Sequence, residues 1–411
     1  MAGLDRGALA VALRLAVAFG SARPVLEFDS LEYATLARHI RFDHSFSFGA
    51  VHRWSGPITD DPSGRLHPTA WRAPLFPLFM AGLWWNSADS PPVRTVQVVN
   101  ALLGGVTAGL TCSIAAALAP AMALPAGLIS AAWPLGVITD AAPMSEALFT
   151  VLLMAGLWWW QRNAPVAAGI SFGAACLTRV TLLPLLVLIP LFTLWPRLRR
   201  RGLITISLCS LLTIAPWTVR NLIVLHRAIP VATAGSGANL LLGSVFVRPF
   251  SGGNLWSDFS RDPDVERVLS QGLEDSDAET AMRRLAVSRI AAHPAAWLVG
   301  RVLQYPRFLI DAGEYWPQLG FAPGLPRIMS FLASAGLLTL AGLGAFSLRR
   351  EWTMWLPILL LTGTLLLMHL PILAERRHGA PLIPLFAILL AARRRGLSLV
   401  PLVSDRRLVE S

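Results

Sequence analysis

The sequence predicts an all-α protein that crosses a membrane many times; hydrophobicity, run length and the placement of arginine support this prediction. Of the 411 residues, 54% are hydrophobic and 14% are charged. The runs 121–139, 207–219 and 326–346 each approach the roughly 20 residues that a helix needs to span a hydrocarbon core of about 30 Å. Runs of this length match membrane helices rather than the shorter strands of a barrel. We therefore expect about 10–11 transmembrane helices.

The formal charge of +11 comes from arginine alone, because the sequence contains no lysine. Arginines cluster directly after hydrophobic runs, at 197–201, 349–350 and 393–395. Such clusters mark the cytoplasmic ends of membrane helices, where they face anionic lipids. No soluble stretch combines basic residues with interleaved aromatics, so membrane lipids rather than nucleic acid are the expected partner. The three cysteines lie in hydrophobic runs, which argues against disulfides and zinc.

These clusters predict a topology with a cytoplasmic N-terminus. The first hydrophobic segment, 8–21, is interpreted as a retained helix rather than a signal peptide, since Arg14 interrupts it. Residues 24–70 then form a first external loop within an N-terminal module, 1–225. Residues 226–325 form a second large external loop with interfacial helices. The remainder, 326–411, holds spans near 327–347, 352–372 and 380–392 and a short basic cytoplasmic tail.

Two arrangements of the middle of the chain satisfy the same endpoints. In one, 73–86 crosses the membrane and 165–195 is a single long helix. In the other, 73–86 is re-entrant and the long segment breaks at Thr178 and Arg179 into two short crossings. The second is preferred, because it takes Arg179 out of the middle of the bilayer, where a lone arginine costs about 2.5 kcal/mol or more.

The first external loop contains a predicted amphipathic helix over 30–42 that lies on the membrane surface. One face carries Leu31, Ala34, Leu36, Ala37 and Ile40, and the other carries Glu32, Arg38, His39 and Arg41. Asp29 or Ser30 would cap this helix, with the carboxylate at the positive end of the helix dipole. The second loop contains a charged helical stretch, 264–289, and an aromatic interfacial segment, 297–316.

Charged and polar residues converge on the external face, where the positive-inside rule does not expect arginines. The predicted topology puts these residues there: Asp29, Glu32, Arg72, Arg220, Asn239, Arg376, Arg377 and His378. Guanidinium groups at the edge of the hydrocarbon are suited to grip a phosphate, and a nearby carboxylate can deprotonate an incoming hydroxyl. Phosphate, hydroxyl and lipid interface together indicate glycosyl transfer from a lipid-phosphate sugar.

Six short blocks follow one another in a fixed order between residues 29 and 384. They are Asp29-Ser30-x-Glu32-Tyr33, Arg72-x-Pro74-x-x-Pro77, Ser145-Glu146-x-Leu148-Phe149, Leu177-Thr178-Arg179, Ala215-Pro216-Trp217-Thr218-x-Arg220-Asn221 and Arg377-His378-Gly379-x-Pro381. The ordered set resembles the bacterial protein-mannosyltransferase and aminoarabinose-transferase branch of the GT-C membrane glycosyltransferases, which is similar to glycosyltransferase family 39. The resemblance covers most of the chain and does not specify the sugar.

The resemblance implies a GT-C fold in the bacterial inner (plasma) membrane. It also implies a polyprenyl-phosphate sugar donor and inverting transfer on the periplasmic or exterior side. Asp29 matches the family's catalytic aspartate, which activates the acceptor. Arg72, Arg220 and Arg377 match blocks near the donor phosphate or the active cavity, and Glu146 matches a position that is acidic in relatives.

We therefore expect Asp29 to be catalytic. The expected substrate-binding residues are Glu32, Tyr33, Arg72, Glu146, Arg220, Asn239, Arg376, Arg377 and His378. The chain departs from the family at Ser30, where relatives often have glutamate, and at His378, where they often have tyrosine. The first departure weakens a role for paired carboxylates.

Several alternatives stay open at the level of sequence. No cofactor is expected, because the potential metal ligands of the first loop have no recognised metal-binding spacing. A divalent metal remains an alternative. The potential ligands are His39, Asp43, His44, His52, Asp60, Asp61 and His67. The acceptor is a glycan, a lipid or a protein. The competing class is a transporter or flippase for lipid-linked sugars, which would carry charges along a midplane pathway in a repeated scaffold.

Overall fold

The computed structural model describes residues 4–20, 29–49, 63–85, 90–194, 200–233, 237–245, 262–271, 273, 275–310, 324–348, 352–372 and 375–397. The first half of the chain forms α1 (Leu4–Gly20), α2 (Asp29–Asp43), β1 (Ser47–Phe48), β2 (His67–Pro68), α3 (Leu75–Leu83), α4 (Val93–Leu118), η1 (Pro120–Met122), α5 (Ala123–Ala132), α6 (Pro134–Ala141), α7 (Glu146–Gln161), α8 (Pro165–Thr178), η2 (Val180–Leu182), α9 (Leu183–Leu188), η3 (Ile189–Leu194) and α10 (Arg200–Leu225).

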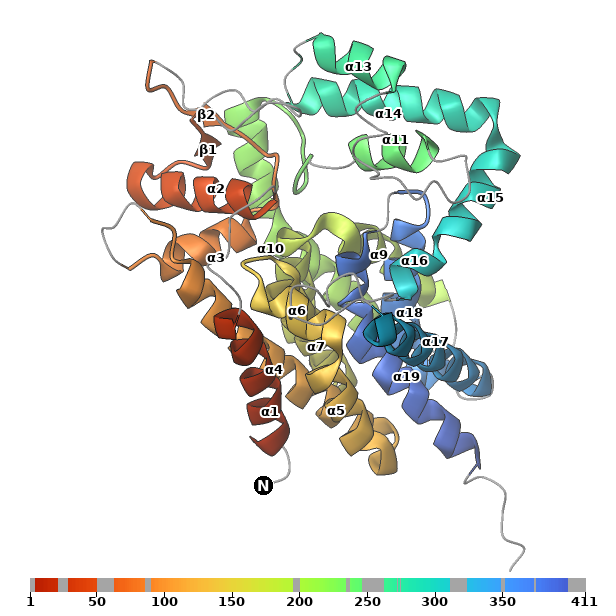
Figure 1. Ribbon diagram of the computed structural model, residues 1–411. Helices are drawn as coiled ribbons and strands as arrows, with labels where there is room; N and C mark the ends of the chain where they lie inside the picture. Colours follow the sequence, from red (N-terminus) through yellow and green to blue (C-terminus); the bar gives the residue numbers. More distant parts are fainter. Residues whose placement is uncertain are drawn as a thin grey trace, which may run out of the picture.

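The second half forms α11 (Ala238–Val245), α13 (Pro263–Ser270), α14 (Asp275–Ala292), α15 (Pro294–Gln304), α16 (Pro306–Leu309), α17 (Gly324–Ser347), α18 (Trp352–His369), η6 (Arg376–Gly379) and α19 (Leu382–Leu397). Among the described residues the only sheet is the antiparallel pair of β1 and β2, so the predicted all-α class is confirmed. Figure 1 shows α11, α13 and α14 at the upper end of a bundle whose lower end is reached by α1, α4, α5 and α19.

Four described helices are long and apolar enough to cross a membrane: α4, α10, α17 and α18. A fifth candidate is the pair of α5 and α6, which is bent by 48°. Shorter apolar helices are Gly7–Gly20, Pro165–Thr178, Val180–Phe192, Pro294–Leu303 and Leu382–Ala392. The predicted number of crossings therefore requires these shorter helices as well as the long ones. The spans predicted in the C-terminal part correspond to α17, α18 and α19.

The first helix is anchored by its one internal arginine. Nε of Arg14 donates to Oδ2 of Asp140 on α6 at 2.8 Å, and Nη1 donates to the carbonyl of Ala131 at 2.8 Å. Both charged side chains are buried, with relative exposures of 2% and 9%. The arginine that interrupts the hydrophobic segment thus joins α1 to α5 and α6.

Two features of the middle of the chain bear on the predicted arrangements: the length of α3 and the break at Arg179. Helix α3 has nine residues and a length of about 14 Å, too short to cross a hydrocarbon core of about 30 Å. Helix α8 ends at Thr178, and Arg179 is extended, with φ −147° and ψ 121°. A short 3-10 turn follows before α9, so 165–195 is not one continuous helix.

Helix α2 differs from its predicted amphipathic pattern. Its buried residues include Tyr33, Ala34, Leu36 and Ala37, but also His39, which was predicted on the polar face. His39 is 2% exposed, and its Nδ1 lies 2.7 Å from the carbonyl of Ser47, so the β1–β2 pair satisfies the imidazole. Leu31, predicted on the apolar face, is instead exposed. The contact with the strand, which the helical pattern cannot reveal, explains the burial of His39.

The region predicted as the second external loop contains a small helical layer. Ala238, Leu241, Val265, Ala278 and Met282 form its buried cluster, contributed by α11, α13 and α14. The charged helical stretch predicted over 264–289 consists of two helices. The first, α13, ends at Ser270, and the second, α14, begins at Asp275.

The segment predicted as interfacial begins with α15, whose apolar side chains Leu298, Val299 and Val302 are exposed. Its part beyond residue 310 lies outside the described residues. The buried face of α15 carries Arg301, which donates to the carbonyl of Ile372 at 3.0 Å. An exposed apolar face on a helix outside the main bundle fits a position at the membrane surface.

Candidate active site

Asp29 lies in the first turn of α2 and is held by arginines from two distant parts of the chain. Its Oδ1 accepts a hydrogen bond from Nη2 of Arg72, and its Oδ2 accepts one from Nη2 of Arg377 at 2.9 Å. Arg72 follows β2 and precedes α3, whereas Arg377 lies on η6, just before α19. The carboxylate therefore joins the first external loop to the C-terminal helices.

Glu32, one turn further along α2, fixes the other side of Arg72. Its Oε2 accepts from Nε of Arg72 and from the indole of Trp71, the latter at 3.0 Å. The Arg72 guanidinium also lies 5.5 Å from the ring centre of Tyr33 and 5.9 Å from that of Trp71. With two carboxylates and two aromatic faces around it, the guanidinium has a defined orientation.

A second ion pair comes from the hairpin of α7 and α8. Nη1 of Arg179 donates to Oε1 of Glu146 at 2.7 Å, and Glu146 is 1% exposed. The hydroxyl of Ser145 lies 3.4 Å from both Arg179 Nη1 and the Tyr33 hydroxyl, which connects this pair to α2. Oε2 of Glu146 is buried and has no hydrogen-bond partner among the described residues. An unsatisfied buried carboxylate oxygen is costly and is available to a polar ligand.

The C-terminal segment adds a carboxylate and two imidazoles. Nε of Arg377 donates to Oε2 of Glu375 at 2.7 Å. The ring of His378 lies 5.2 Å from that of His369 at the end of α18, and its buried Nδ1 has no hydrogen-bond partner among the described residues. Arg376, half-buried, lies on the same turn of η6.

The arginines control the ionisation of Asp29. Burial alone would raise the pKa of its carboxyl, but Arg72, Arg377 and Arg179 lower it from 3.8 to about 2. Asp29 is therefore ionised at neutral pH. For His378, burial and the nearby charge of Arg179 hold the pKa well below its usual value, so this imidazole is neutral.

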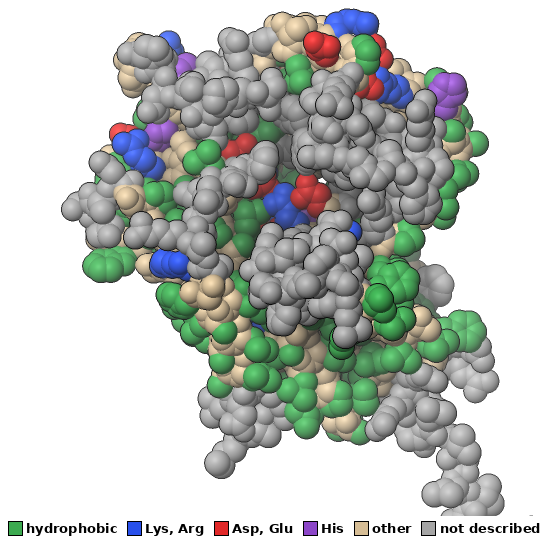
Figure 2. Space-filling view, viewed as in Figure 1, with side chains coloured by type: hydrophobic (Ala, Val, Ile, Leu, Met, Phe, Trp, Pro, Cys, Tyr) green, Lys and Arg blue, Asp and Glu red, His purple; other side chains and the backbone are tan. Residues whose placement is uncertain are grey.

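Acidic and basic side chains are visible together in a recess near the middle of the face in Figure 2, and hydrophobic side chains dominate the lower part of the molecule. The contacts above account for such a cluster. It contains Asp29, Glu32, Glu146 and Glu375 with Arg72, Arg179 and Arg377, taken from segments as far as 348 residues apart. We call these seven residues the Asp29 cluster.

Arg220 and Asn239, two of the predicted site residues, make no hydrogen bond or ion pair with the Asp29 cluster in the described part of the chain. Arg220 donates to the carbonyls of Thr69 at 2.7 Å and Phe46 at 3.0 Å, and it lies 4.9 Å from the ring centre of Trp217. It fastens the end of α10 to the first external loop. Asn239 lies at the second position of α11, in the layer above the bundle.

Sequence analysis missed some members of the cluster and its surroundings. Arg179 appeared in a motif but was treated only as an interfacial arginine, and Glu375, Trp71 and His369 were not proposed as site residues. The neighbouring Arg-Arg-His sequence is a local signal for Glu375. No local signal points to His369, because its partner on η6 is known only from the fold.

In the part of the chain that the structure describes, no group of three or more His, Cys, Asp or Glu side chains is arranged to hold a metal ion. The candidate ligands His52, Asp60 and Asp61, and the neighbouring carboxylate Glu27, lie outside the described residues. His39, one of the predicted loop ligands, is instead buried against Ser47.

Comparison with solved structures identifies the architecture. The chain is similar to the archaeal oligosaccharyltransferase AglB from Archaeoglobus fulgidus, solved in complex with an inhibitory peptide and a dolichol-phosphate, at a TM-score of 0.54 and 11% sequence identity. The chain has a GT-C fold. The match covers 95% of this chain and 50% of AglB, so the chain spans half the length of that protein. No family model matches the sequence, and no curated protein matches it.

Proposed function

We propose that the protein is a membrane glycosyltransferase that moves a sugar from a polyprenyl-phosphate donor to an acceptor hydroxyl or phosphate. The observation that carries the proposal is the half-buried carboxylate of Asp29, held between Arg72 and Arg377 in a chain with a GT-C fold. AglB, which shares the fold, was solved with a lipid phosphate bound. This supports a lipid-phosphate donor here.

The arginines of the Asp29 cluster form the donor phosphate site. Arg72 and Arg377 face the same carboxylate, so they are close enough together to grip one phosphate. Their present partners are carboxylates, and the incoming phosphate takes over those hydrogen bonds. Arg220, predicted beside the phosphate, holds loop carbonyls and has a positioning role instead.

The exchange of partners gives Asp29 its role. While both of its oxygens accept from arginine, Asp29 is a weak base. Once the donor phosphate engages Arg72 and Arg377, the Asp29 carboxylate is released toward the acceptor and its pKa rises. The acceptor oxygen then attacks the anomeric carbon from the face opposite the phosphate, its proton passes to Asp29, and the bond to the phosphate oxygen breaks with its electron pair.

Charge stabilisation supplies the second part of catalysis. Negative charge grows on the leaving phosphate, and fixed guanidinium groups in a buried site stabilise it without reorganisation. The free Oε2 of Glu146 accepts a hydrogen bond from a sugar hydroxyl, which the donor brings to the site. Neutral His378, with its unsatisfied Nδ1, serves as a second polar contact.

We propose that no metal cofactor takes part. Asp29 and Glu32 are both bound by Arg72, and a divalent cation beside two guanidinium groups is repelled. Transfer is then expected to persist in excess EDTA, measured as sugar released from the donor lipid. Full loss with EDTA and recovery with Mg²⁺ or Mn²⁺ would contradict this.

The finer assignments rest on the motif resemblance. We propose a hexosyl- or pentosyltransferase of the protein-mannosyltransferase and aminoarabinose-transferase branch. It acts in the bacterial inner membrane with the Asp29 cluster on the periplasmic or exterior side. In the sequence, the arginine-rich segments precede or begin α10, follow α17 and end α19, which supports this orientation. The acceptor belongs to the cell envelope, as a glycan, a lipid or a protein.

A deletion strain tests the proposal, because loss of the enzyme leaves its donor unused. We expect a polyprenyl-phosphate sugar to accumulate in the lipid extract and an envelope sugar to disappear. Wild-type protein and Asp43→Asn restore both, whereas Asp29→Asn does not. Asp43 is the matched control, since it is an exposed aspartate at the other end of α2. Restoration by Asp29→Asn would contradict the proposal.

A further inference from the structure

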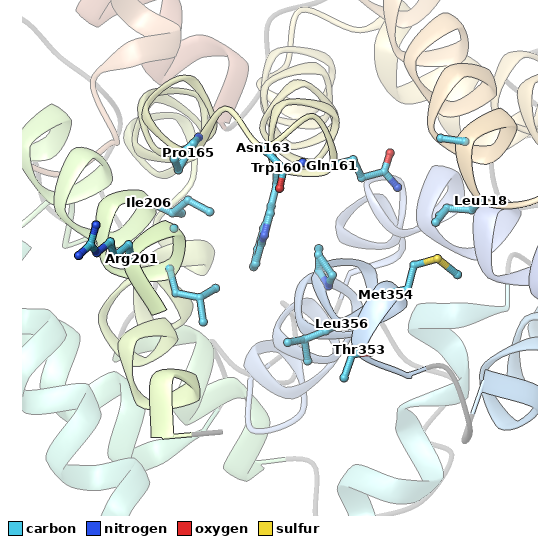
Figure 3. A pocket seen from close by; sticks show the side chains of 14 residues that line it. Leu118, Trp160, Gln161, Asn163, Pro165, Arg201, Ile206, Thr353, Met354 and Leu356 are labelled. Carbon is cyan, nitrogen blue, oxygen red and sulfur yellow. The ribbon is translucent and has the colours of Figure 1, made fainter. Parts of the chain in front are cut away.

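A cavity of about 930 Å³ lies between the end of α4, the turn from α7 to α8, the start of α10 and the start of α18. Its size is within the range of about 300–1,000 Å³ that ligand pockets occupy. Figure 3 shows Trp160 standing between Ile206 of α10 and Leu356 of α18, with Arg201 and Gln161 at opposite margins.

The cavity is separate from the Asp29 cluster. Helix α7 runs from Glu146, in the cluster, to Gln161, at the cavity, and its 16 residues span about 24 Å. Helix α18 likewise runs from Thr353 at the cavity to His369 beside His378. Because α7 and α18 each have one end at the Asp29 cluster and the other at the cavity, the cavity and the cluster lie at opposite ends of these helices.

The chemistry of the cavity is that of a lipid with a negative headgroup. The walls include Leu118, Leu203, Ile206 and Leu356, and the margin carries Arg201. No described residue that lines the cavity is acidic. Arg201 is exposed, and Arg197, Arg199 and Arg200 precede it in the sequence.

The surroundings point to a lipid rather than a soluble ligand. Ile204 and Leu208 on α10, next to the cavity-lining residues of the same helix, are 50% and 55% exposed. Exposed leucine and isoleucine on a predicted membrane helix face hydrocarbon. The cavity therefore adjoins the lipid-facing surface of α10 at its arginine-rich end.

We propose that this cavity binds one anionic phospholipid of the surrounding leaflet. The headgroup phosphate lies at the margin beside Arg201, and an acyl chain enters between Trp160, Ile206 and Leu356. Basic pockets between membrane helices at the cytoplasmic side bind anionic headgroups. The lipid fills space between α8, α10 and α18, which hold Arg179, Arg220 and His369 at their other ends.

Gly202 is the best position for a substitution that fills the cavity. It lines the cavity, and a Cβ added there meets no atom within 4 Å. Gly202→Leu is expected to occupy lipid space without a clash. Gly109→Leu is the matched control: Gly109 is also a helical glycine with open space around it, but it does not line the cavity. Arg201→Gln removes the charge at the margin, and Arg267→Gln removes an exposed arginine of the second external loop as its control.

The experiment measures lipid retained by the full-length protein in native mass spectrometry after purification in neutral detergent with equal phosphatidylglycerol and phosphatidylcholine. We expect retained phosphatidylglycerol on wild type, Gly109→Leu and Arg267→Gln, and its loss in Gly202→Leu. Arg201→Gln is expected to lower the preference for phosphatidylglycerol about fivefold, which corresponds to about 1 kcal/mol for one arginine.

Equal retention of both lipids by wild type, or unchanged phosphatidylglycerol retention in both Gly202→Leu and Arg201→Gln, would overturn the proposal. In a matched sample, inorganic phosphate replaces phosphatidylglycerol; phosphate retained as well as the lipid would show an isolated anion site and would also overturn the proposal. The readout is bound lipid, so it does not depend on glycosyl transfer.

Discussion

At the scale of single residues, Asp29 has more than the role of a helix cap that its place at the start of α2 predicts. Both of its oxygens accept from arginines, one from the first external loop and one from the segment before α19. A carboxylate that only stabilised the helix dipole would not need two guanidinium partners. The geometry therefore favours Asp29 as the residue through which donor binding and acceptor activation are connected.

The low pKa of Asp29 makes a prediction for the pH dependence of transfer. A carboxyl whose pKa falls from 3.8 to about 2 on folding stays ionised throughout the neutral range. Its pairing stabilises the fold above about pH 4 and is lost as the pH falls toward 2. The profile of kcat/KM, which reports the free enzyme, should show no acid limb from Asp29 above about pH 4.

The profile of kcat reports the donor-bound enzyme, in which the phosphate has taken the arginines. We expect its acid limb at a higher pH than that of kcat/KM, measured as initial rates of sugar release between pH 4 and 8. Coincident limbs in the two profiles would show that the arginines do not leave Asp29 when the donor binds.

Arg377 offers a direct test of phosphate binding. Arg377→Gln removes one charge from the leaving phosphate and one partner of Asp29, and we expect kcat/KM to fall about 10²-fold or more. The matched control is Arg38→Gln, an exposed arginine on α2, which should change the rate less than twofold. A rate for Arg377→Gln close to that of the control would rule out the assigned role.

At the scale of elements, the attachment of α1 depends on one buried ion pair and one glycine. A Cβ on Gly104 of α4 would lie 2.6 Å from Cδ of Arg14 and 2.8 Å from Cζ. Arg14 cannot give way easily, because Asp140 and the carbonyls of Ala10 and Ala131 hold it.

Arg14→Ala is expected to cost about 3–5 kcal/mol in the free energy of unfolding, since it leaves Asp140 buried without its partner. Gly104→Ala should destabilise through the same contact, and replacing both Arg14 and Asp140 with leucine should recover most of the loss. Thermal unfolding in detergent measures this. An Arg14→Ala protein as stable as wild type would show that the pair does not anchor α1.

A helix or a helix break was predictable from sequence where the residues that cause it lie within the same segment. The three C-terminal helices follow from long apolar runs, and the break at Arg179 follows from the cost of a charge in lipid. The burial of His39 was not predictable, because its partner comes from a strand that the helical pattern does not contain. The charged helical stretch predicted over 264–289 is helical in two pieces, α13 and α14.

At the scale of the whole molecule, the site is assembled from segments that the sequence keeps apart. Asp29 was predictable from its motif, whereas its contact with Arg377, 348 residues away, required the fold. The ion pair of Glu146 and Arg179 joins the ends of an antiparallel hairpin in the same way. Motif order gives candidate residues, and only the fold shows which of them contact one another.

The layer above the bundle is coupled to the same site. The position of a Cβ on Gly243 of α11 lies 3.3 Å from Cα of Ile372, a few residues before Glu375 and Arg377. Arg301 of α15 donates to the carbonyl of Ile372, so α11 and α15 both contact the chain shortly before Arg377.

The most direct test of the account follows the sugar itself. Purified protein in phospholipid vesicles receives the labelled polyprenyl-phosphate sugar that accumulates in the deletion strain, together with an envelope extract from that strain as acceptor. We predict transfer of label to the extract by wild type and by Asp43→Asn, and a loss of at least about 10³-fold with Asp29→Asn. Undiminished transfer by Asp29→Asn, or movement of intact donor across the vesicle membrane without any transfer, would contradict the account.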